Sequence, residues 1–271
     1  MTYPWNSLGY LRGMFSFRRG DKILGGGTAL SPTSTNPGVT LAWWIYHEAV
    51  RREGLAADEF CRNYVLSYPR SGNHATRFAL EYLSGQPTLG ADDHESLLRP
   101  GSPYDLPIFL RSEHVRISIP LPPPVAIKRH RLKPNDRVEK LVLIERDPVE
   151  AVLSHTNRGD KATKEDLEAG VSWWKSLQEQ FEKHPKDQRH LVRYENITNN
   201  DTEWIKALAV FLHIKTKDEV IQQCGELLGE ARKVLTRSPL TKHPHTYREM
   251  FPEKATVVER FVTAQGLVRL S

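Results

Sequence analysis

The stretch NYVLSYPRSGNHATRFALEYL, residues 63–83, decides the fold. Residues 64–68 form a short, mostly apolar run that is typical of a buried strand. Residues 69–74 interrupt that pattern with proline, glycine and asparagine, and the apolar spacing of residues 75–83 then predicts a helix. A strand, a tight loop and a helix in direct succession are the first unit of an α/β fold.

The same alternation continues along the chain. Further short apolar strands are predicted at 125–127, 141–144 and 191–194, and helices from residue 148 and over 165–184, 202–213, 218–235 and 253–265. This order predicts an α/β fold with a central parallel sheet and helices on both faces. We expect one domain over residues 1–271, in which a Gly- and Pro-rich loop at 25–38 precedes a helix at 40–53.

Composition and length exclude several classes of protein. The chain has 271 residues, and its 39% hydrophobic content can form a large core. Apolar stretches such as 41–46 are far shorter than a membrane span requires, and the first twenty residues lack the pattern of an export signal. We therefore expect a cytoplasmic protein without a membrane span, in which Cys61 and Cys224 are reduced and partly buried.

The charge balance favours anionic ligands. A formal net charge of +5 is mild, and the sequence lacks the basic stripe interleaved with aromatic residues that is typical of nucleic-acid binding. The densest basic stretch, residues 128–133, follows a predicted strand directly. It could therefore line a small-molecule site or bind a polyanion.

Two loops at predicted strand ends carry candidate anion sites. In residues 68–74, Gly72 and the following helix start would direct backbone N–H groups at a phosphate or sulfate. The loop lacks the Lys–Ser/Thr pair of a Walker A motif, which argues against an ordinary NTPase. In residues 145–154, Arg146 and Ser154 could contact one phosphate, while Glu145 or Asp147 could instead take the place of a magnesium-binding Walker B carboxylate.

These two loops resemble the motifs of sulfotransferases that use 3′-phosphoadenosine 5′-phosphosulfate (PAPS). Residues 67–74, SYPRSGNH, are similar to the family's 5′-phosphosulfate loop. Arg146 followed eight residues later by Ser154 is similar to its 3′-phosphate motif. Weaker similarities lie at 127–130, 194–196 and 247–251, so that the resemblance covers about residues 62–265.

The resemblance implies a P-loop-like sulfotransferase fold and transfer of a sulfuryl group from PAPS to a hydroxyl or amine of a small molecule. Adenosine 3′,5′-bisphosphate (PAP) would be the product, and no metal is expected. His130 is the candidate base, assisted by Lys128 and Arg70 as catalytic cations. The cofactor-binding residues implied are Arg70, Ser71, Gly72, Asn73, His74, Arg146, Ser154 and Tyr194.

The sequence also departs from the family pattern. Arg70 replaces the usual loop lysine and cannot give up its proton, so its help to the leaving group must be electrostatic. Ala75 replaces an aromatic residue that often stacks on adenine. The last cofactor loop lacks its R-K-G sequence, and the nearby cations are Arg237, Lys242, His243 and Arg248.

Several alternatives remain open from the sequence. His74 and His114 are rival candidates for the base, and the Trp43–Trp44 and Trp173–Trp174 pairs could line the acceptor pocket or belong to the core. The chain could be a P-loop-like kinase using ATP, a non-catalytic nucleotide or polyanion binder, or a sulfotransferase relative that no longer transfers sulfate. The resemblance places the acceptor pocket in variable segments, at 1–60, 85–124 and 232–250, and no feature predicts an oligomeric state.

Overall fold

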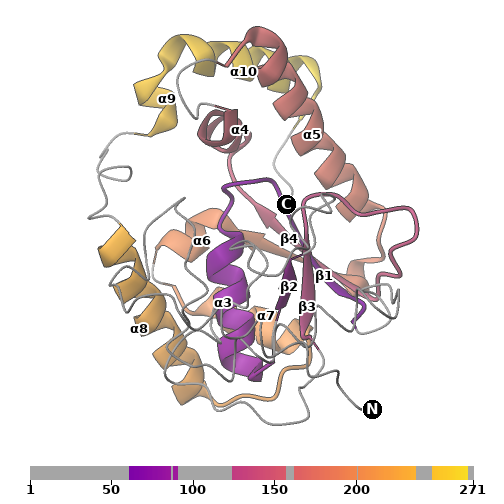
Figure 1. Cartoon of the computed structure of the whole chain (residues 1–271), viewed down its shortest axis with the longest axis vertical. Helices are drawn as coiled ribbons and strands as arrows, with labels where there is room; N and C mark the ends of the chain where they lie inside the picture. The colour runs from indigo at the N-terminus through magenta and orange to yellow at the C-terminus, as the bar shows by residue number, and fades with distance from the viewer. Residues whose placement is uncertain are drawn as a thin grey trace, which may run out of the picture.

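The computed structural model describes residues 61–86, 88–90, 124–156, 162–199, 201–235 and 246–267. The loop at 25–38, the helix at 40–53, His114 and three of the C-terminal cations (Arg237, Lys242 and His243) lie outside the described residues. The described part is a sheet with helices on both faces (Figure 1).

A five-stranded parallel sheet forms the centre, in the order β2-β3-β1-β4-β5. The strands are β1 (Asn63–Ser67), β2 (Thr88–Gly90), β3 (Ala126–Arg129), β4 (Lys140–Glu145) and β5 (Arg189–Arg193). Strands β1, β3 and β4 are buried on both faces, which explains their nearly continuous apolar sequences. The predicted parallel α/β fold is thus confirmed.

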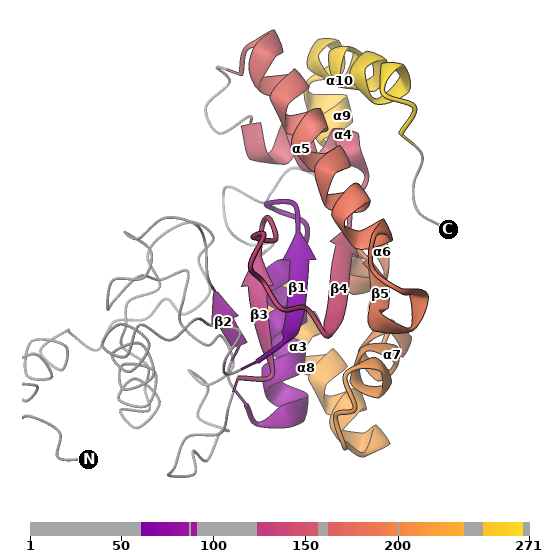
Figure 2. The same cartoon turned by 90° about the vertical axis from the view of Figure 1, so that its right-hand side faces the viewer.

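Two sets of helices, which alternate along the chain, cover the two faces of the sheet. One core cluster lies under α4 (Pro148–Thr156), α5 (Lys164–Glu182) and α10 (Pro252–Ala264). The other lies under α3 (Asn73–Ser84), α7 (Glu203–Phe211) and α8 (Asp218–Leu235). Figure 2 shows the arrowheads of β1, β3 and β4 at one edge of the sheet. The loops that follow these strands are therefore neighbours at that edge.

The short helices α6 (Tyr194–Thr198) and α9 (Tyr247–Met250) and the edge strand β2 have no counterpart among the predicted elements. Two helix starts are defined by local sequence. Helix α10 begins with Pro252, and α5 begins with a capping box between Thr163 and Asp166. Cys61 and Cys224 are free and buried. None of the helices in the described ranges is long and apolar enough to cross a membrane.

A loop without a helix connects β3 to β4 and covers the face of the sheet under α5. Its buried Asp136 accepts hydrogen bonds from Arg129 at 3.1 Å, from the Tyr64 hydroxyl at 3.3 Å and from the backbone N–H of Lys133 at 2.8 Å. The basic stretch 128–133 is divided as a result: Lys128 and Arg129 are each only 6% exposed, whereas the residues at 131 and 133 are exposed.

Candidate active site

The loop after β1 has the geometry of an anion-binding turn. Arg70 adopts a φ of 67° and Gly72 a φ of 91°, and α3 starts at Asn73 without a side-chain hydrogen bond to its cap from the described residues. The Ser71 hydroxyl is buried and has no hydrogen-bond partner in the described part of the chain. Uncapped N–H groups and a buried, unpartnered hydroxyl fit an anion at this turn.

Gly72 also allows the loop to approach α6 closely. A Cβ at this position would lie 3.0 Å from Ile197 Cδ1 and 3.1 Å from Tyr194 Cδ2, in a backbone conformation that favours glycine. Any other residue at position 72 would therefore have to displace the Tyr194 ring.

Arg146 joins the two anion loops. Its guanidinium donates a hydrogen bond to the Arg70 carbonyl at 2.8 Å, lies 4.4 Å from the Tyr194 ring centroid and is 3.5 Å from the Glu150 carboxylate. Ser154 lies two turns further along α4 and is 9% exposed. The structure thus brings the loop after β1, Arg146 and Tyr194 together at the carboxyl edge of the sheet.

The C-terminal segment is attached to the same loop. Glu150 accepts the backbone N–H groups of Tyr247 at 3.1 Å and Arg248 at 3.0 Å. The Arg248 side chain contacts Asp147 at 3.2 Å and also pairs with Glu259. Of the four C-terminal cations named from the sequence, Arg248 is the one within the described residues, and it lies beside the Arg146 loop.

His130 follows the last residue of β3. Its Nδ1 is 2.7 Å from the Ser67 carbonyl oxygen. Because a carbonyl can only accept, Nδ1 must carry the proton, and Nε2 is then the nitrogen of the neutral ring that can accept one. The His130 position is therefore suited to a base whose tautomer is fixed by the end of β1.

Lys128 and His130 both lie at the carboxyl end of β3, but their side chains face the two different core clusters. The alternation of β3 places Lys128 on the side of Ala126, which packs in the α3 cluster. The His130 ring lies 6.1 Å, edge to face, from Trp173 of α5, which packs against the other cluster. His74 is exposed in the first turn of α3, and Ala75 packs partly buried in the α3 cluster.

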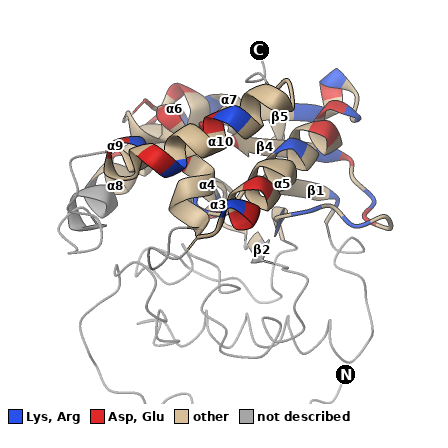
Figure 3. Ribbon diagram, turned by 90° about the horizontal axis from the view of Figure 1, so that it is seen from above, with Lys and Arg blue, Asp and Glu red and all other residues tan. Residues whose placement is uncertain are grey.

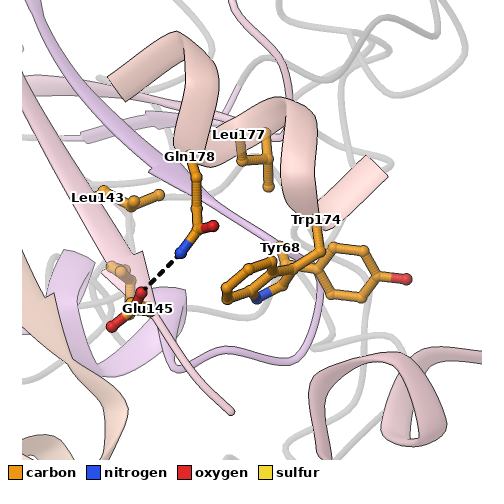
Figure 4. Close-up of a pocket in the computed structure, with 7 residues that line it drawn as sticks. Tyr68, Leu143, Glu145, Trp174, Leu177 and Gln178 are labelled. Carbon is orange, nitrogen blue, oxygen red and sulfur yellow. Dashed lines mark hydrogen bonds between the residues drawn. The ribbon is translucent and has the colours of Figure 1, made fainter. Parts of the chain in front are cut away.

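Glu145, one of the two Walker B candidates from the sequence, is the last residue of β4 and lies at the same edge of the sheet. Glu145, 2% exposed, accepts hydrogen bonds from Gln178 at 3.0 Å and Arg193 at 3.3 Å, so its carboxylate is engaged by protein donors. Figure 4 shows Gln178 reaching from α5 to Glu145, with Trp174 and Tyr68 beside a small pocket. Within the described ranges, no three His, Cys, Asp or Glu side chains gather as a metal site requires.

We expect Gly72→Ala to lower both stability and nucleotide affinity. The left-handed backbone alone costs about 1–2 kcal/mol for a non-glycine residue, and the added Cβ also meets Ile197 and Tyr194. Gly85→Ala is the matched control, because Gly85 has a φ of 65° with no atom within 4 Å of an added Cβ. Urea unfolding should show a loss in both variants, and titration with PAP should show weakened binding in Gly72→Ala alone. Equal PAP affinity in the two variants would contradict the Tyr194 contact.

Comparisons with known proteins found similarity both in sequence and in fold. Residues 129–230 match the family model described as a sulfotransferase domain, a range that contains His130, Arg146, Ser154 and Tyr194. The crystal structure of retinol dehydratase in complex with androsterone and inactive cofactor PAP has a TM-score of 0.50 and 16% identity, covering 83% of this chain and 85% of that one. That of mouse sulfotransferase SULT7A1 complexed with PAP has a TM-score of 0.48 and 14% identity, covering 76% and 84%.

A comparison with curated protein sequences gave no match. At 16% identity, the likeness to retinol dehydratase shows a common fold and nothing more. The family-model match has a different basis, because it rests on the sequence that carries the Arg146 and Tyr194 side of the site. The match over residues 129–230 and the shared fold both support the resemblance of this chain to the sulfotransferase family.

Proposed function

We propose that this protein is a sulfotransferase that transfers a sulfuryl group from PAPS to a hydroxyl or amine of a small-molecule acceptor. The observation that carries the proposal is the 2.8 Å hydrogen bond from Arg146 to the Arg70 carbonyl. It joins the two loops that the family resemblance assigns to the two ends of one bisphosphorylated nucleotide. PAPS supplies the activated sulfuryl group, attached through the 5′-phosphate of the nucleotide.

The residues around the loop after β1 are suited to the 5′ end of the nucleotide. Ser71 offers a buried hydroxyl, Gly72 and Asn73 offer backbone N–H groups at the start of α3, and Arg70 and His74 lie on the exposed side of the same turn. Arg70 keeps its positive charge at every relevant pH, so we assign it electrostatic stabilisation of the leaving phosphate. His74 is assigned to binding rather than to proton transfer.

Arg146, Ser154 and Tyr194 are assigned to the 3′-phosphate side. A guanidinium can hold phosphate through two parallel hydrogen bonds, and Tyr194 limits its motion from one face. Glu150, at 3.5 Å, would compete with the phosphate for Arg146 but is also held by the backbone N–H groups at the start of α9. Because the Glu150 carboxylate is shared with these two N–H groups, it does not fully neutralise the positive charge of Arg146.

On the acceptor side, we assign His130 Nε2 as the base that accepts the proton lost by the acceptor. The Ser67 carbonyl supports this role by fixing the proton on Nδ1. Lys128 is assigned to the negative charge that develops during transfer. We further propose that residues 1–60 contribute to the acceptor pocket, as the family resemblance implies.

Titration calorimetry with PAP, AMP and ATP, without metal, tests the donor assignment. We expect PAP to bind more tightly than AMP, and Arg146→Ala to weaken PAP binding about 10- to 100-fold, because a hydrogen bond to a charged group contributes about 1.5–3 kcal/mol. Arg62→Ala is the control, since Arg62 precedes β1 at the opposite edge of the sheet and pairs with exposed Glu139.

The same titration distinguishes the alternatives. A preference for ATP with strict magnesium dependence would favour a kinase. Binding without preference for a 3′-phosphate, with a steep decrease at high salt, would favour a polyanion binder. The burial of Lys128 and Arg129 divides the basic stretch on which polyanion binding was predicted. Figure 3 also shows acidic and basic residues interspersed along α5 and α10 rather than separated by sign.

A further inference from the structure

We propose that the adjacent residues Trp173 and Trp174 are positioning residues, one for each half of the reaction. Trp173 holds His130, and Trp174 holds Arg146. This inference rests on the roles proposed above for His130 and Arg146. It implies that α5 fixes the position of the acceptor side of the site relative to the nucleotide side.

The two indole N–H groups make equivalent contacts. Trp173 Nε1 donates to the His130 carbonyl at 2.9 Å, and Trp174 Nε1 donates to the Arg146 carbonyl at 3.2 Å. Each acceptor belongs to the first residue after a strand, β3 for His130 and β4 for Arg146. Past a strand end, a carbonyl has left the regular ladder and needs another donor. One helix supplies both donors from consecutive residues.

Packing fixes the orientation of both indoles. Trp174 is 3% exposed within the α5 cluster. The half-buried Trp173 ring lies 5.1 Å from the Tyr68 ring and 5.7 Å from the His155 ring, with His130 on a further side at 6.1 Å. Rings held in this way lose little further freedom when they donate a hydrogen bond.

Helix α5 packs closely against its neighbours at Gly170. At Gly170, an added Cβ would lie 2.9 Å from Val152 of α4 and 3.0 Å from the Tyr68 hydroxyl oxygen. The helix therefore lies directly against both α4 and the end of β1. It provides a fixed reference for the two strand ends that carry His130 and Arg146.

Two hydrogen bonds hold His130, and Trp173 supplies the second of them. The Ser67 carbonyl holds the imidazole Nδ1, whereas the Trp173 N–H holds the backbone of the same residue. With both in place, the direction of Nε2 is fixed. Without the indole N–H, the backbone of residue 130 can shift relative to Ser67, and an error of about 1 Å in a reacting group can cost up to about 10²-fold in rate.

Tryptophan-to-phenylalanine variants remove the N–H and keep an apolar ring. We expect Trp173→Phe to lower kcat about tenfold with PAP affinity within twofold of wild type. We expect Trp174→Phe to weaken PAP binding about fivefold, the usual effect of one neutral hydrogen bond. Trp204→Phe is the control, because Trp204 is buried on α7 and its indole N–H has no hydrogen-bond partner among the described residues. It should leave kcat and PAP affinity unchanged.

Two further measurements separate positioning from a general loss of stability. In a His130→Asn background, Trp173→Phe should have little further effect on kcat, because its effect passes through the imidazole. In nucleotide-free protein labelled with ¹⁵N-histidine, NMR should show the Nδ1–H tautomer of His130 in wild type and Trp174→Phe, and a mixture of tautomers in Trp173→Phe.

The inference is overturned if the two variants have the same kinetic profile, if Trp173→Phe lowers kcat equally without His130, or if the tautomer is unchanged. Failure of the proposed function would look different. Wild type would then neither bind PAP nor transfer sulfate, while the NMR dependence of His130 on Trp173 would persist and uphold the positioning role of Trp173.

Discussion

Replacing His130 with asparagine is expected to lower kcat by about 10²- to 10⁴-fold, the usual contribution of a general base. The asparagine amide can still donate to the Ser67 carbonyl, which His130 Nδ1 contacts at 2.7 Å. What is lost is the second ring nitrogen, Nε2, which would accept the proton. Affinity for PAP should stay within about twofold, because the proposed nucleotide contacts lie on other loops.

Steady-state kinetics over a range of pH and titration with PAP would test this. The decrease in rate towards acid pH that reports protonation of a base should disappear in His130→Asn. His213→Asn is the matched control, since His213 contacts Lys140 at the amino end of β4, the opposite edge of the sheet. Its φ of 56° is also tolerated by asparagine. If kcat of His130→Asn remained within threefold of wild type, His74 would become the next candidate.

Much of the fold and part of the site could be predicted from the sequence. The strands are short apolar runs bounded by residues that break strands, and parallel strands place their carboxyl ends at one edge. This reasoning brought residues 68–74 and Arg146 to the same place, and the contact between Arg146 and the Arg70 carbonyl agrees with it. The 3.6-residue periodicity likewise located α3, α5, α8 and α10 to within a few residues.

Hydrogen bonds between distant segments, made by one atom of a large side chain, could not be predicted from strand and helix patterns. Nothing in the spacing of Trp173 and Trp174 shows that their N–H groups reach the ends of β3 and β4. Glu150 in the first turn of α4 fits a common pattern of helix starts. Its contacts with the backbone of residues 247 and 248 depend on where the C-terminal segment crosses. Such contacts follow from tertiary packing rather than from local pattern.

The edge strand β2 was missed for a related reason. Thr88–Gly90 is too short for an alternating pattern, and what holds it is a polar network. Arg77 and Glu81, four residues apart on α3, have the spacing of an exposed ion pair, yet they are 1% and 0% exposed. Arg77 donates to the Thr88 hydroxyl at 2.8 Å and to its carbonyl at 3.2 Å, while Glu81 accepts from the Thr88 N–H at 3.1 Å and from its hydroxyl.

Glu81→Ala is therefore expected to destabilise the protein by about 3–5 kcal/mol, because it removes the charged acceptor from a buried network in which Thr88 links Glu81 to Arg77. Arg77→Met should cost a similar amount for the converse reason. The double variant Arg77→Met with Glu81→Leu should cost much less than the sum, since an apolar pair of similar volume can replace a buried charged network. Strand β2 pairs with β3 from Thr88 to Gly90, and Gly90 lies opposite Lys128. The single variants should thus also disturb the proposed active site.

Urea unfolding of the two single variants and the double variant measures these differences. Glu139→Ala is the matched control, because the Arg62–Glu139 pair has exposed side chains, at 46% and 63%, and an exposed pair contributes only about 0–1 kcal/mol. Additive losses in the double variant would mean that the network contributes packing rather than mutual compensation of charge. A Glu81→Ala loss as small as that of Glu139→Ala would mean that water reaches Arg77, contrary to its burial in the structure. The buried network predicts a large loss in each single variant and a partial recovery in the double variant, since the two charged side chains contact the same residue, Thr88, within one buried network.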